Sequence, residues 1–125
     1  MRPVCTARGN GFTRDRGLRA GLAINPKTAL PDLRYLQSYL DYVLILTNEP
    51  EYPSAPFLPE TLDKVRQGRS MLPGKDLDWV VDGGITPANA GSAVAAGATV
   101  IVAGRSVFRD GALAQNLSAL RAATK

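Results

Sequence analysis

Four runs of apolar residues recur along the chain, separated by longer stretches in which apolar and polar residues mix. The runs cover residues 21–24, 42–46, 79–81 and 99–103. Inside each run the apolar residues are continuous and do not alternate with polar ones. Continuous apolar runs of this length are typical of strands buried on both faces, as in a parallel sheet. The pattern therefore predicts four parallel strands with both faces covered.

Helical spacing follows each predicted strand. Leucines three and four residues apart predict a helix that opens at residues 31–33, and a second helix is predicted to begin at Pro59. A third is predicted to begin at Pro87 with Thr86 as its N-cap and to end at Gly97. The last covers about residues 111–123. Strands that alternate with helices form right-handed βαβ units, so the predicted class is α/β, either an open sheet or a barrel.

Composition narrows the class of protein. The 125 residues are 45% hydrophobic and 21% charged, which is ordinary for one globular domain. No apolar run approaches the roughly 18 residues that span a bilayer, so we expect no membrane partner. Cys5 is the single cysteine, which excludes an intrachain disulfide and favours a reducing, cytoplasmic location. The sequence has no histidine, the commonest acid/base at neutral pH and the commonest metal ligand.

The net charge of +4 belongs to the first 19 residues. That segment holds five arginines and one aspartate, whereas residues 20–125 hold ten basic and ten acidic residues. A basic, acid-poor start is compatible with a nucleic-acid arm or a transit peptide. No aromatic residues interleave with the charge, as a stacking site for nucleic acid would need, so we expect no nucleic-acid partner. We expect residues 1–19 to be a poorly ordered basic segment that precedes a domain at residues 20–125.

Candidate chemistry lies where the predicted strands end, because functional groups collect at the carboxyl ends of parallel strands. The third strand ends in Asp82-Gly83-Gly84 and the fourth in Gly104-Arg105-Ser106. Glycine turns that lead into helices let backbone N–H groups point at an anion such as phosphate. A tight structural turn explains the two glycines equally well, and Asp82 alone fits either a turn residue or a catalytic acid. Surface exposure is the better interpretation of Lys27 and Glu49, at the ends of the first two strands.

Three stretches of the chain, in this order and spacing, carry a family resemblance. They read GLAINPKT, VLILTNEP…FLPETLDKVR and VVDGGITPANAGSAVAAGATVIVAGRSVF. Over about residues 20–110 the chain resembles the ribulose-phosphate 3-epimerase family. The resemblance implies a (βα)8 TIM-type barrel, of which this chain matches four βα units, the fifth to the eighth strands. The family interconverts ribulose 5-phosphate and xylulose 5-phosphate in the pentose phosphate pathway, with a divalent metal ion (zinc, iron or manganese) and two aspartates on opposite faces of the reacting carbon.

The resemblance also assigns roles to residues of this chain. Asp82 takes the place of the second aspartate, which is a proton donor and a metal ligand. The turn at Gly83 and Gly84 and the pair Gly104 and Arg105 take the place of the phosphate-binding groups. The family's glycine-rich lid falls on four residues here: Glu51, Tyr52, Pro53 and Ser54.

Departures from the family pattern limit what this chain is expected to do alone. It lacks the family's first aspartate and metal-binding histidines, so Asp82 would be a lone metal ligand, too few to hold a divalent ion. In the lid, Pro53 offers no N–H and Glu51 would repel a phosphate. We therefore expect a phosphorylated pentose as partner but little or no turnover, and whether the chain is an enzyme stays open.

A four-strand half-barrel leaves two open sheet edges and an exposed apolar interior face, so we expect it to form a homo-oligomer or to pair with a missing half. Two other interpretations stay open. One is a non-catalytic phosphosugar-binding or self-assembling half-barrel module. The other is a truncated gene product whose first half lies upstream.

Overall fold

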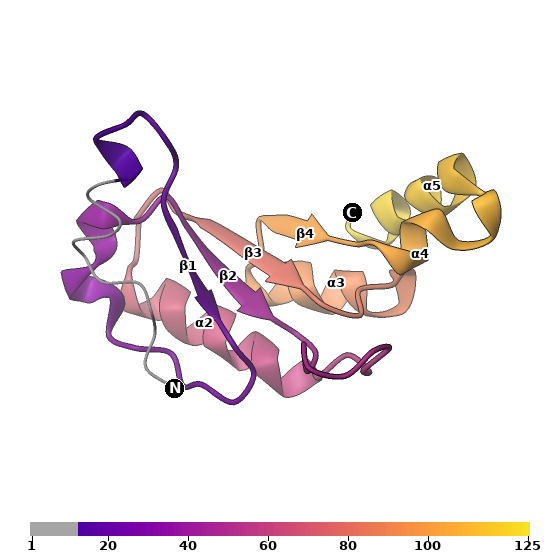
Figure 1. The fold of residues 1–125 in the computed structure, drawn as a ribbon, viewed down its shortest axis with the longest axis horizontal. Helices are drawn as coiled ribbons and strands as arrows, with labels where there is room; N and C mark the ends of the chain where they lie inside the picture. Colours follow the sequence, from indigo (N-terminus) through magenta and orange to yellow (C-terminus); the bar gives the residue numbers. More distant parts are fainter. Residues whose placement is uncertain (1–12) are drawn as a thin grey trace.

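The structure, a computed structural model that describes residues 13–125, contains one sheet of four parallel strands (Figure 1). The strands are β1 (Gly21–Ile24), β2 (Tyr42–Leu46), β3 (Asp78–Asp82) and β4 (Val100–Val102), and they lie side by side in chain order. The four predicted strands are confirmed, and so is the α/β class. Each strand begins and ends within one residue of its apolar run, and β3 extends by one residue onto Asp82.

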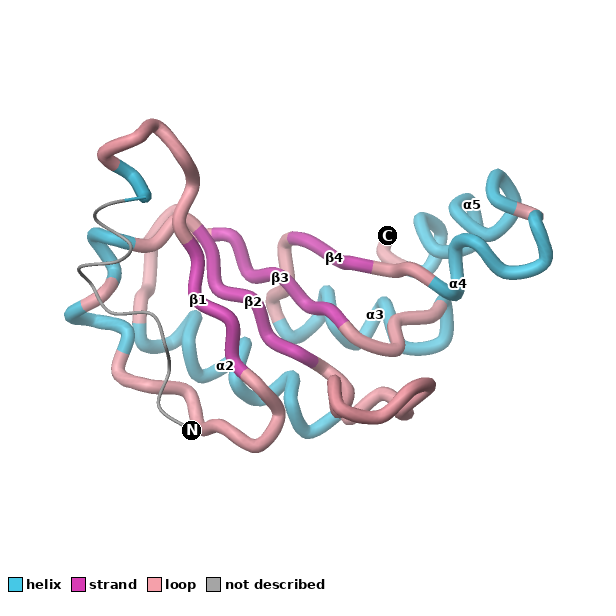
Figure 2. The backbone as a smooth tube through the Cα atoms, viewed as in Figure 1, coloured by secondary structure: helices cyan, strands magenta, loops and turns pink. Residues whose placement is uncertain are grey.

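Helices cover one face of this sheet (Figure 2). The turn η3 (Pro59–Thr61) leads into α2 (Leu62–Met71), which joins β2 to β3, and α3 (Pro87–Ala96) joins β3 to β4. The predicted start of α3 after Thr86 and its end at Gly97, which adopts a left-handed conformation with φ 108°, are confirmed. The core lies between these helices and every second strand residue, with fully buried Val43, Ile45 and Val81 packed over α2 and α3.

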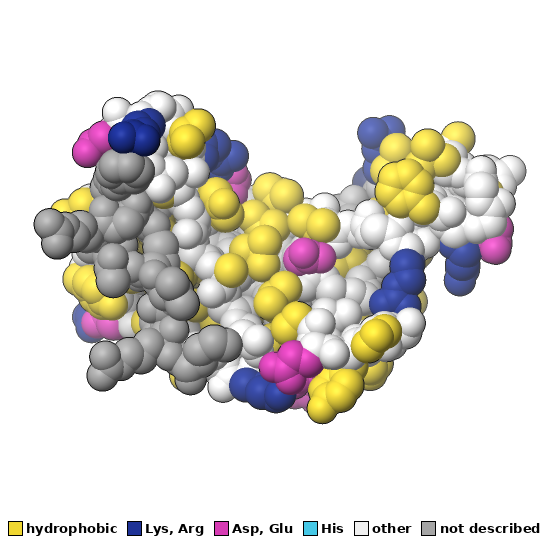
Figure 3. Space-filling view, viewed as in Figure 1, with side chains coloured by type: hydrophobic (Ala, Val, Ile, Leu, Met, Phe, Trp, Pro, Cys, Tyr) yellow, Lys and Arg dark blue, Asp and Glu magenta, His cyan; other side chains and the backbone are white. Residues whose placement is uncertain are grey.

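The apolar runs predicted that both sheet faces are covered, which is wrong for the described residues, whereas the exposed apolar face expected of a half-barrel is present. Burial alternates along β2 and β3, so that Leu44, Leu46 and Val80 are only half-buried, and Val100 and Val102 of β4 are exposed. Figure 3 looks onto this second face and shows hydrophobic side chains gathered over the strands. A continuous apolar run predicts that both faces of a strand are buried. It does not indicate which segment or which other chain buries each face.

The predicted helix after Pro31 is also wrong. Two 3-10 turns, η1 (Leu33–Tyr35) and η2 (Gln37–Tyr39), occupy the connection between β1 and β2. Asp32 caps η1 through the backbone N–H of Arg34. Only a few residues remain before β2 begins, and two tight turns are enough to bury the three leucines of this stretch, Leu33, Leu36 and Leu40.

The chain after β4 forms a short helix that the sequence did not predict, α4 (Arg105–Phe108), followed by η4 (Arg109–Gly111) and α5 (Leu113–Ala123). The last predicted helix, residues 111–123, corresponds to α5. Among residues 13–125 no helix is long and apolar enough to cross a bilayer.

Of the basic segment, residues 1–12 lie outside the described residues. Two of its arginines lie beside aspartates at the amino ends of β2 and β3. The Arg14 Nε atom is 3.8 Å from the Asp41 Oδ2 atom, and the Arg19 guanidinium pairs with the Asp78 carboxylate. This hydrogen bond with Arg19 lowers the pKa of Asp78 below its ordinary value.

Candidate functional site

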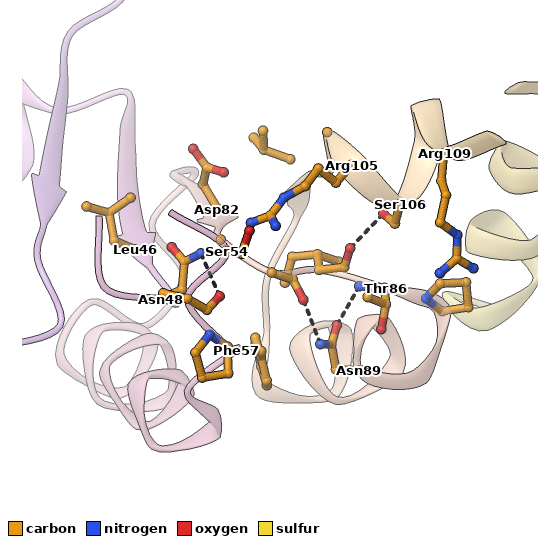
Figure 4. A pocket seen from close by; sticks show the side chains of 18 of the residues that line it. Leu46, Asn48, Ser54, Phe57, Asp82, Thr86, Asn89, Arg105, Ser106 and Arg109 are labelled. Carbon is orange, nitrogen blue, oxygen red and sulfur yellow. Dashed lines mark hydrogen bonds between the residues drawn. The ribbon is translucent and has the colours of Figure 1, made fainter. Parts of the chain in front are cut away.

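A cleft of about 1040 Å³ opens at the carboxyl ends of β2, β3 and β4 (Figure 4). Its wall includes the two strand ends that the sequence singled out. All five residues predicted for catalysis and phosphate binding line it together: Asp82, Gly83, Gly84, Gly104 and Arg105. The strand register explains the convergence, because Asp82 lies opposite Leu46 on one side and Val102 on the other, so that the three strands end at one level.

The Asp82-Gly83-Gly84 turn requires both of its glycines. Gly83 has φ 131° and Gly84 has φ 68°, values that residues other than glycine rarely adopt. A Cβ atom at Gly83 would lie 2.3 Å from the Oδ1 atom of Asn48 and 2.8 Å from its backbone nitrogen. A Cβ atom at Gly84 would lie 3.1 Å from the backbone nitrogen of Phe57. The turn is therefore packed directly against the loop that follows β2.

Thr47, the residue after β2, holds this turn from one side. The Thr47 hydroxyl donates to the Gly83 carbonyl oxygen at 2.6 Å, and the Thr47 backbone N–H donates to the Asp82 carbonyl oxygen at 2.8 Å. Thr47 is fully buried. Because it is buried, the Thr47 hydroxyl bonds to the Gly83 carbonyl oxygen in place of water. This hydrogen bond holds the turn against the end of β2.

Asn89 and Ser106 hold the turn from the other side (Figure 4). The Asn89 side chain donates to the Gly84 carbonyl oxygen and accepts from the Thr86 backbone N–H, both at 2.9 Å. The Ser106 hydroxyl donates to the Ile85 carbonyl oxygen at 2.7 Å, which ties α4 to the same loop. The first turn of α3 thus opens beside the two glycines, with its positive dipole end at the cleft.

Sequence reasoning missed these supporting residues. Asn89 carried a usable signal, since an acceptor side chain three residues after a threonine N-cap is a capping pattern. Thr47 and Ser106 follow predicted strands, but nothing local indicates their partners, which are 36 and 21 residues away in the chain.

Charge in the cleft is unevenly distributed. Asp82 is the only carboxylate among the described residues that line it, while Arg105 and Arg109 both line it. Figure 4 shows the Arg105 side chain reaching from the start of α4 towards the Asp82 side of the cleft. Within residues 13–125 no hydrogen bond or ion pair occupies either the Asp82 carboxylate or the Arg105 guanidinium. An arginine placed in this way is suited to bidentate binding of a phosphate or carboxylate. Arg109 had not been predicted.

Of the four predicted lid residues, only Ser54 lines the cleft. Glu51 turns to Lys27, whose Nζ atom lies 3.3 Å from the Glu51 Oε2 atom and 3.5 Å from the Glu49 Oε2 atom. The hydrogen bond to Glu51 and the charge of Glu49 raise the pKa of Lys27. Tyr52 is exposed. Glu51 thus contacts Lys27, which it shares with Glu49, and does not line the cleft.

The described residues do not fit a divalent metal ion. Within residues 13–125 no three histidine, cysteine, aspartate or glutamate side chains come close enough to share one. Asp82 alone supplies one oxygen-donor group, and metals that favour oxygen or imidazole ligands need several. No chemical step is therefore assigned to a metal in this chain.

Comparison with known proteins gives consistent matches. The sequence model of the "Ribulose-phosphate 3 epimerase family" matches residues 10–108. A ribulose-phosphate 3-epimerase from Synechocystis is 38% identical over 110 residues, which are 86% of this chain and 48% of that protein. The Escherichia coli ribulose-phosphate 3-epimerase is 39% identical over 97 residues, which are 76% of this chain and 43% of that protein.

A chloroplastic ribulose-5-phosphate-3-epimerase from Arabidopsis thaliana is 34% identical and covers 87% of this chain and 40% of that protein. The chain thus spans about half the length of the curated relatives it matches. Among solved structures, one described as "Native KDPGal structure" superposes with a TM-score of 0.62 at 22% identity, over 97% of this chain and 55% of that one. This likeness concerns the fold, and with the family match it identifies the four βα units as half of a (βα)8 barrel.

Proposed function

Because the chain belongs to the ribulose-phosphate 3-epimerase family, we propose that its cleft binds the phosphate group of a phosphorylated pentose and forms one half of an epimerase site. The observation that carries the proposal is the convergence of the Gly83-Gly84 turn, the start of α3 and the Arg105 guanidinium on one cleft. Backbone N–H groups at a helix start and a guanidinium are complementary to a phosphate in charge and geometry. Gly104 contributes space, since nothing lies within 4 Å of the position of a Cβ atom there.

The reaction proposed for the complete site is the interconversion of ribulose 5-phosphate and xylulose 5-phosphate. Inversion at one carbon requires a proton to leave from one face and to return on the other, so two acid/base groups are needed. Asp82, at the end of β3 and open to the cleft, is suited to one of these roles. Among the described residues the cleft wall holds no second carboxylate. We propose that this chain alone binds a phosphopentose weakly and turns it over little or not at all.

Binding is tested first with the sugar itself. Titration of ribulose 5-phosphate into labelled chain, followed by NMR, is expected to shift the backbone N–H signals of Gly84 and of the first turn of α3, while unphosphorylated ribulose leaves them in place. Arg105→Ala is expected to weaken phosphopentose binding about tenfold, the loss of one charge-assisted hydrogen-bond pair. Arg121→Ala, which removes an arginine outside this cleft, is the matched control. Unchanged binding by Arg105→Ala would refute the assignment of the phosphate site.

Turnover is tested separately with a coupled epimerase assay on purified chain, with zinc, manganese or iron added in turn. Little or no turnover is expected. Activity that Asp82→Asn abolishes would show that the chain is a complete catalyst and would contradict the proposal.

The second candidate function is a non-catalytic phosphosugar-binding or self-assembling half-barrel module. The lone carboxylate and the partly exposed apolar strand face favour it. Phosphopentose binding without turnover in any metal would support it. A cytoplasmic location and the division of the chain into a basic segment at residues 1–19 and a domain at residues 20–125 stay predictions.

A further inference from the structure

A second arginine, Arg109, lines the cleft but takes no part in the phosphate binding proposed for Arg105 and the glycine turn. It follows α4 directly, four residues after Arg105. Figure 4 shows the Arg105 side chain reaching towards Asp82, and the Arg109 side chain lying on the other side of Thr86. Thr86 is the N-cap of α3. The two guanidinium groups therefore flank the start of α3, where the phosphate is proposed to bind.

The Arg109 guanidinium is accessible to a ligand. Within residues 13–125 its one ion pair is with the next residue, Asp110, and the Arg109 Nε atom lies 3.7 Å from the Asp110 Oδ2 atom. The two side chains are 76% and 84% exposed, so water screens this pair and leaves it weak. Asp110 does not line the cleft. An anion bound in the cleft can therefore take the place of Asp110 as the partner of Arg109.

The backbone that carries Arg109 is held in place, although the side chain is exposed. The Asn116 side-chain amide, from α5, donates to the Val107 carbonyl oxygen at 3.0 Å and to the Arg109 carbonyl oxygen at 2.8 Å. The Ala112 backbone N–H also donates to the Arg109 carbonyl oxygen, at 3.3 Å. A residue on a fixed backbone loses less conformational freedom when it binds a ligand than a residue on a mobile loop does.

The charge balance of the cleft depends on Arg109. Among residues 13–125, the charged side chains that line the cleft are those of Asp82, Arg105 and Arg109. Without Arg109, the carboxylate of Asp82 would offset the charge of Arg105. A phosphate monoester carries a charge of about −1.5 to −2 at pH 7, so a second guanidinium attracts it more strongly than it attracts a singly charged carboxylate.

We propose that Arg109 is a second phosphate-binding residue, which holds the phosphate from the side opposite Arg105. Its charge makes the cleft selective for a doubly charged phosphate monoester over a singly charged carboxylate. Each guanidinium can donate two parallel hydrogen bonds to phosphate oxygens, so the two arginines bind different oxygens of one phosphate. The inference rests on the proposed phosphate site, and inorganic phosphate tests it independently of the sugar.

The test is an NMR titration of labelled chain at pH 7.5 with inorganic phosphate and, separately, with ribulose 5-phosphate. Arg109→Ala is expected to weaken the binding of both about fivefold to tenfold, because one charge-assisted hydrogen-bond pair is lost. Arg109→Lys keeps the positive charge and is expected to bind both more tightly than Arg109→Ala does.

Arg66→Ala is the matched control. Arg66 is also an exposed arginine paired with a nearby aspartate, Asp63, but it lies on α2 outside the cleft. Its replacement removes the same charge from the chain and is expected to change phosphate binding by less than about twofold, since distant exposed charges are screened. Circular dichroism checks that each variant is folded.

Selectivity is measured with ribonate, a five-carbon sugar acid that carries one carboxylate. The wild type is expected to prefer ribulose 5-phosphate to ribonate, and Arg109→Ala is expected to reduce this preference severalfold. Phosphate binding by Arg109→Ala as tight as that by Arg66→Ala would overturn the inference, and a loss in Arg105→Ala alone would still support the proposed function. Phosphate binding that depends on Arg109, with ribulose 5-phosphate bound no more tightly than inorganic phosphate, would support the inference and contradict the pentose assignment.

Discussion

Replacement of Gly83 by alanine is the sharpest test of how this site is built. Gly83 has φ 131°, and the added methyl group would lie 2.3 Å from the Asn48 side-chain oxygen and 2.8 Å from the Asn48 backbone nitrogen. The side chain of Asn48 has some freedom to move, but the backbone nitrogen is fixed by the loop that follows β2. Backbone strain and a steric clash therefore both destabilise an alanine at position 83.

Their sum can be worked out from the geometry. Holding alanine in a region of φ that suits only glycine costs about 1–3 kcal/mol. Forcing a methyl group into a packed contact costs about another 1–3 kcal/mol. We expect Gly83→Ala to lower the free energy of unfolding by about 2–6 kcal/mol, a large part of the roughly 5–15 kcal/mol that stabilises a native domain.

Urea denaturation followed by the fluorescence of Trp79 measures this loss, and two other glycines separate its causes. Gly111 has φ 67° with nothing within 4 Å of an added Cβ, so Gly111→Ala should cost only about 1 kcal/mol, the strain alone. Gly104 has φ −100° and open space, so Gly104→Ala should change stability by less than about 0.5 kcal/mol. If Gly83→Ala is no more destabilising than Gly104→Ala, the described contact between the turn and Asn48 is wrong.

Three further changes test other parts of the structure. Ser54 has φ 61°, so Ser54→Gly should raise the urea midpoint by the equivalent of about 0.5–1 kcal/mol, and a lower midpoint would contradict the loop conformation. Asp78 has a lowered pKa in the folded state, chiefly from the hydrogen bond with Arg19, so its stabilising effect is present above its unfolded pKa and is lost as pH falls through the folded value. The unfolding free energies of the wild type and Asp78→Asn, compared by urea titration, should therefore differ at pH 7 and begin to converge only as pH falls below about 4, the ordinary pKa of an aspartate; a difference that stays constant below that pH would argue against the ion pair. Lys64 donates from Nζ to two backbone carbonyl oxygens just after β1 at 2.9 Å each, so Lys64→Met should cost about 1–3 kcal/mol and speed hydrogen exchange in that loop, and slow exchange there would disprove the anchoring role.

The elements that the sequence predicted well are those whose signals are local. The start of α3 depends on Thr86 and Pro87, which are neighbours, and its end depends on Gly97, which alone tolerates a left-handed backbone at that point. The four strands follow from apolar runs of three to five residues. The predicted helix after Pro31 failed because leucine spacing of three and four residues fits two 3-10 turns as well as one α-helix, and the short connection to β2 selected the turns.

The Asp82-Gly83-Gly84 turn of the candidate site could be predicted from the sequence, but the residues that surround this turn could not. Asp82, Gly83 and Gly84 are adjacent in sequence, and a strand that ends in an aspartate and two glycines already indicates a special turn. That Arg109 lines the same cleft, and that Thr47 and Ser106 lock the turn, depends on contacts between residues far apart in the chain. No periodicity or motif encodes such contacts, because they arise only when parallel strands bring their carboxyl ends to one level.

The sequence by itself determined that this chain forms alternating strands and helices, that its third strand ends in a glycine turn, and that its net charge lies in the first 19 residues. Only the tertiary structure decided which face of the sheet is buried and which groups share the cleft with Asp82. The reason is physical: hydrophobic periodicity reports that a side chain avoids water, whereas the partner that excludes the water is chosen by packing of the whole chain.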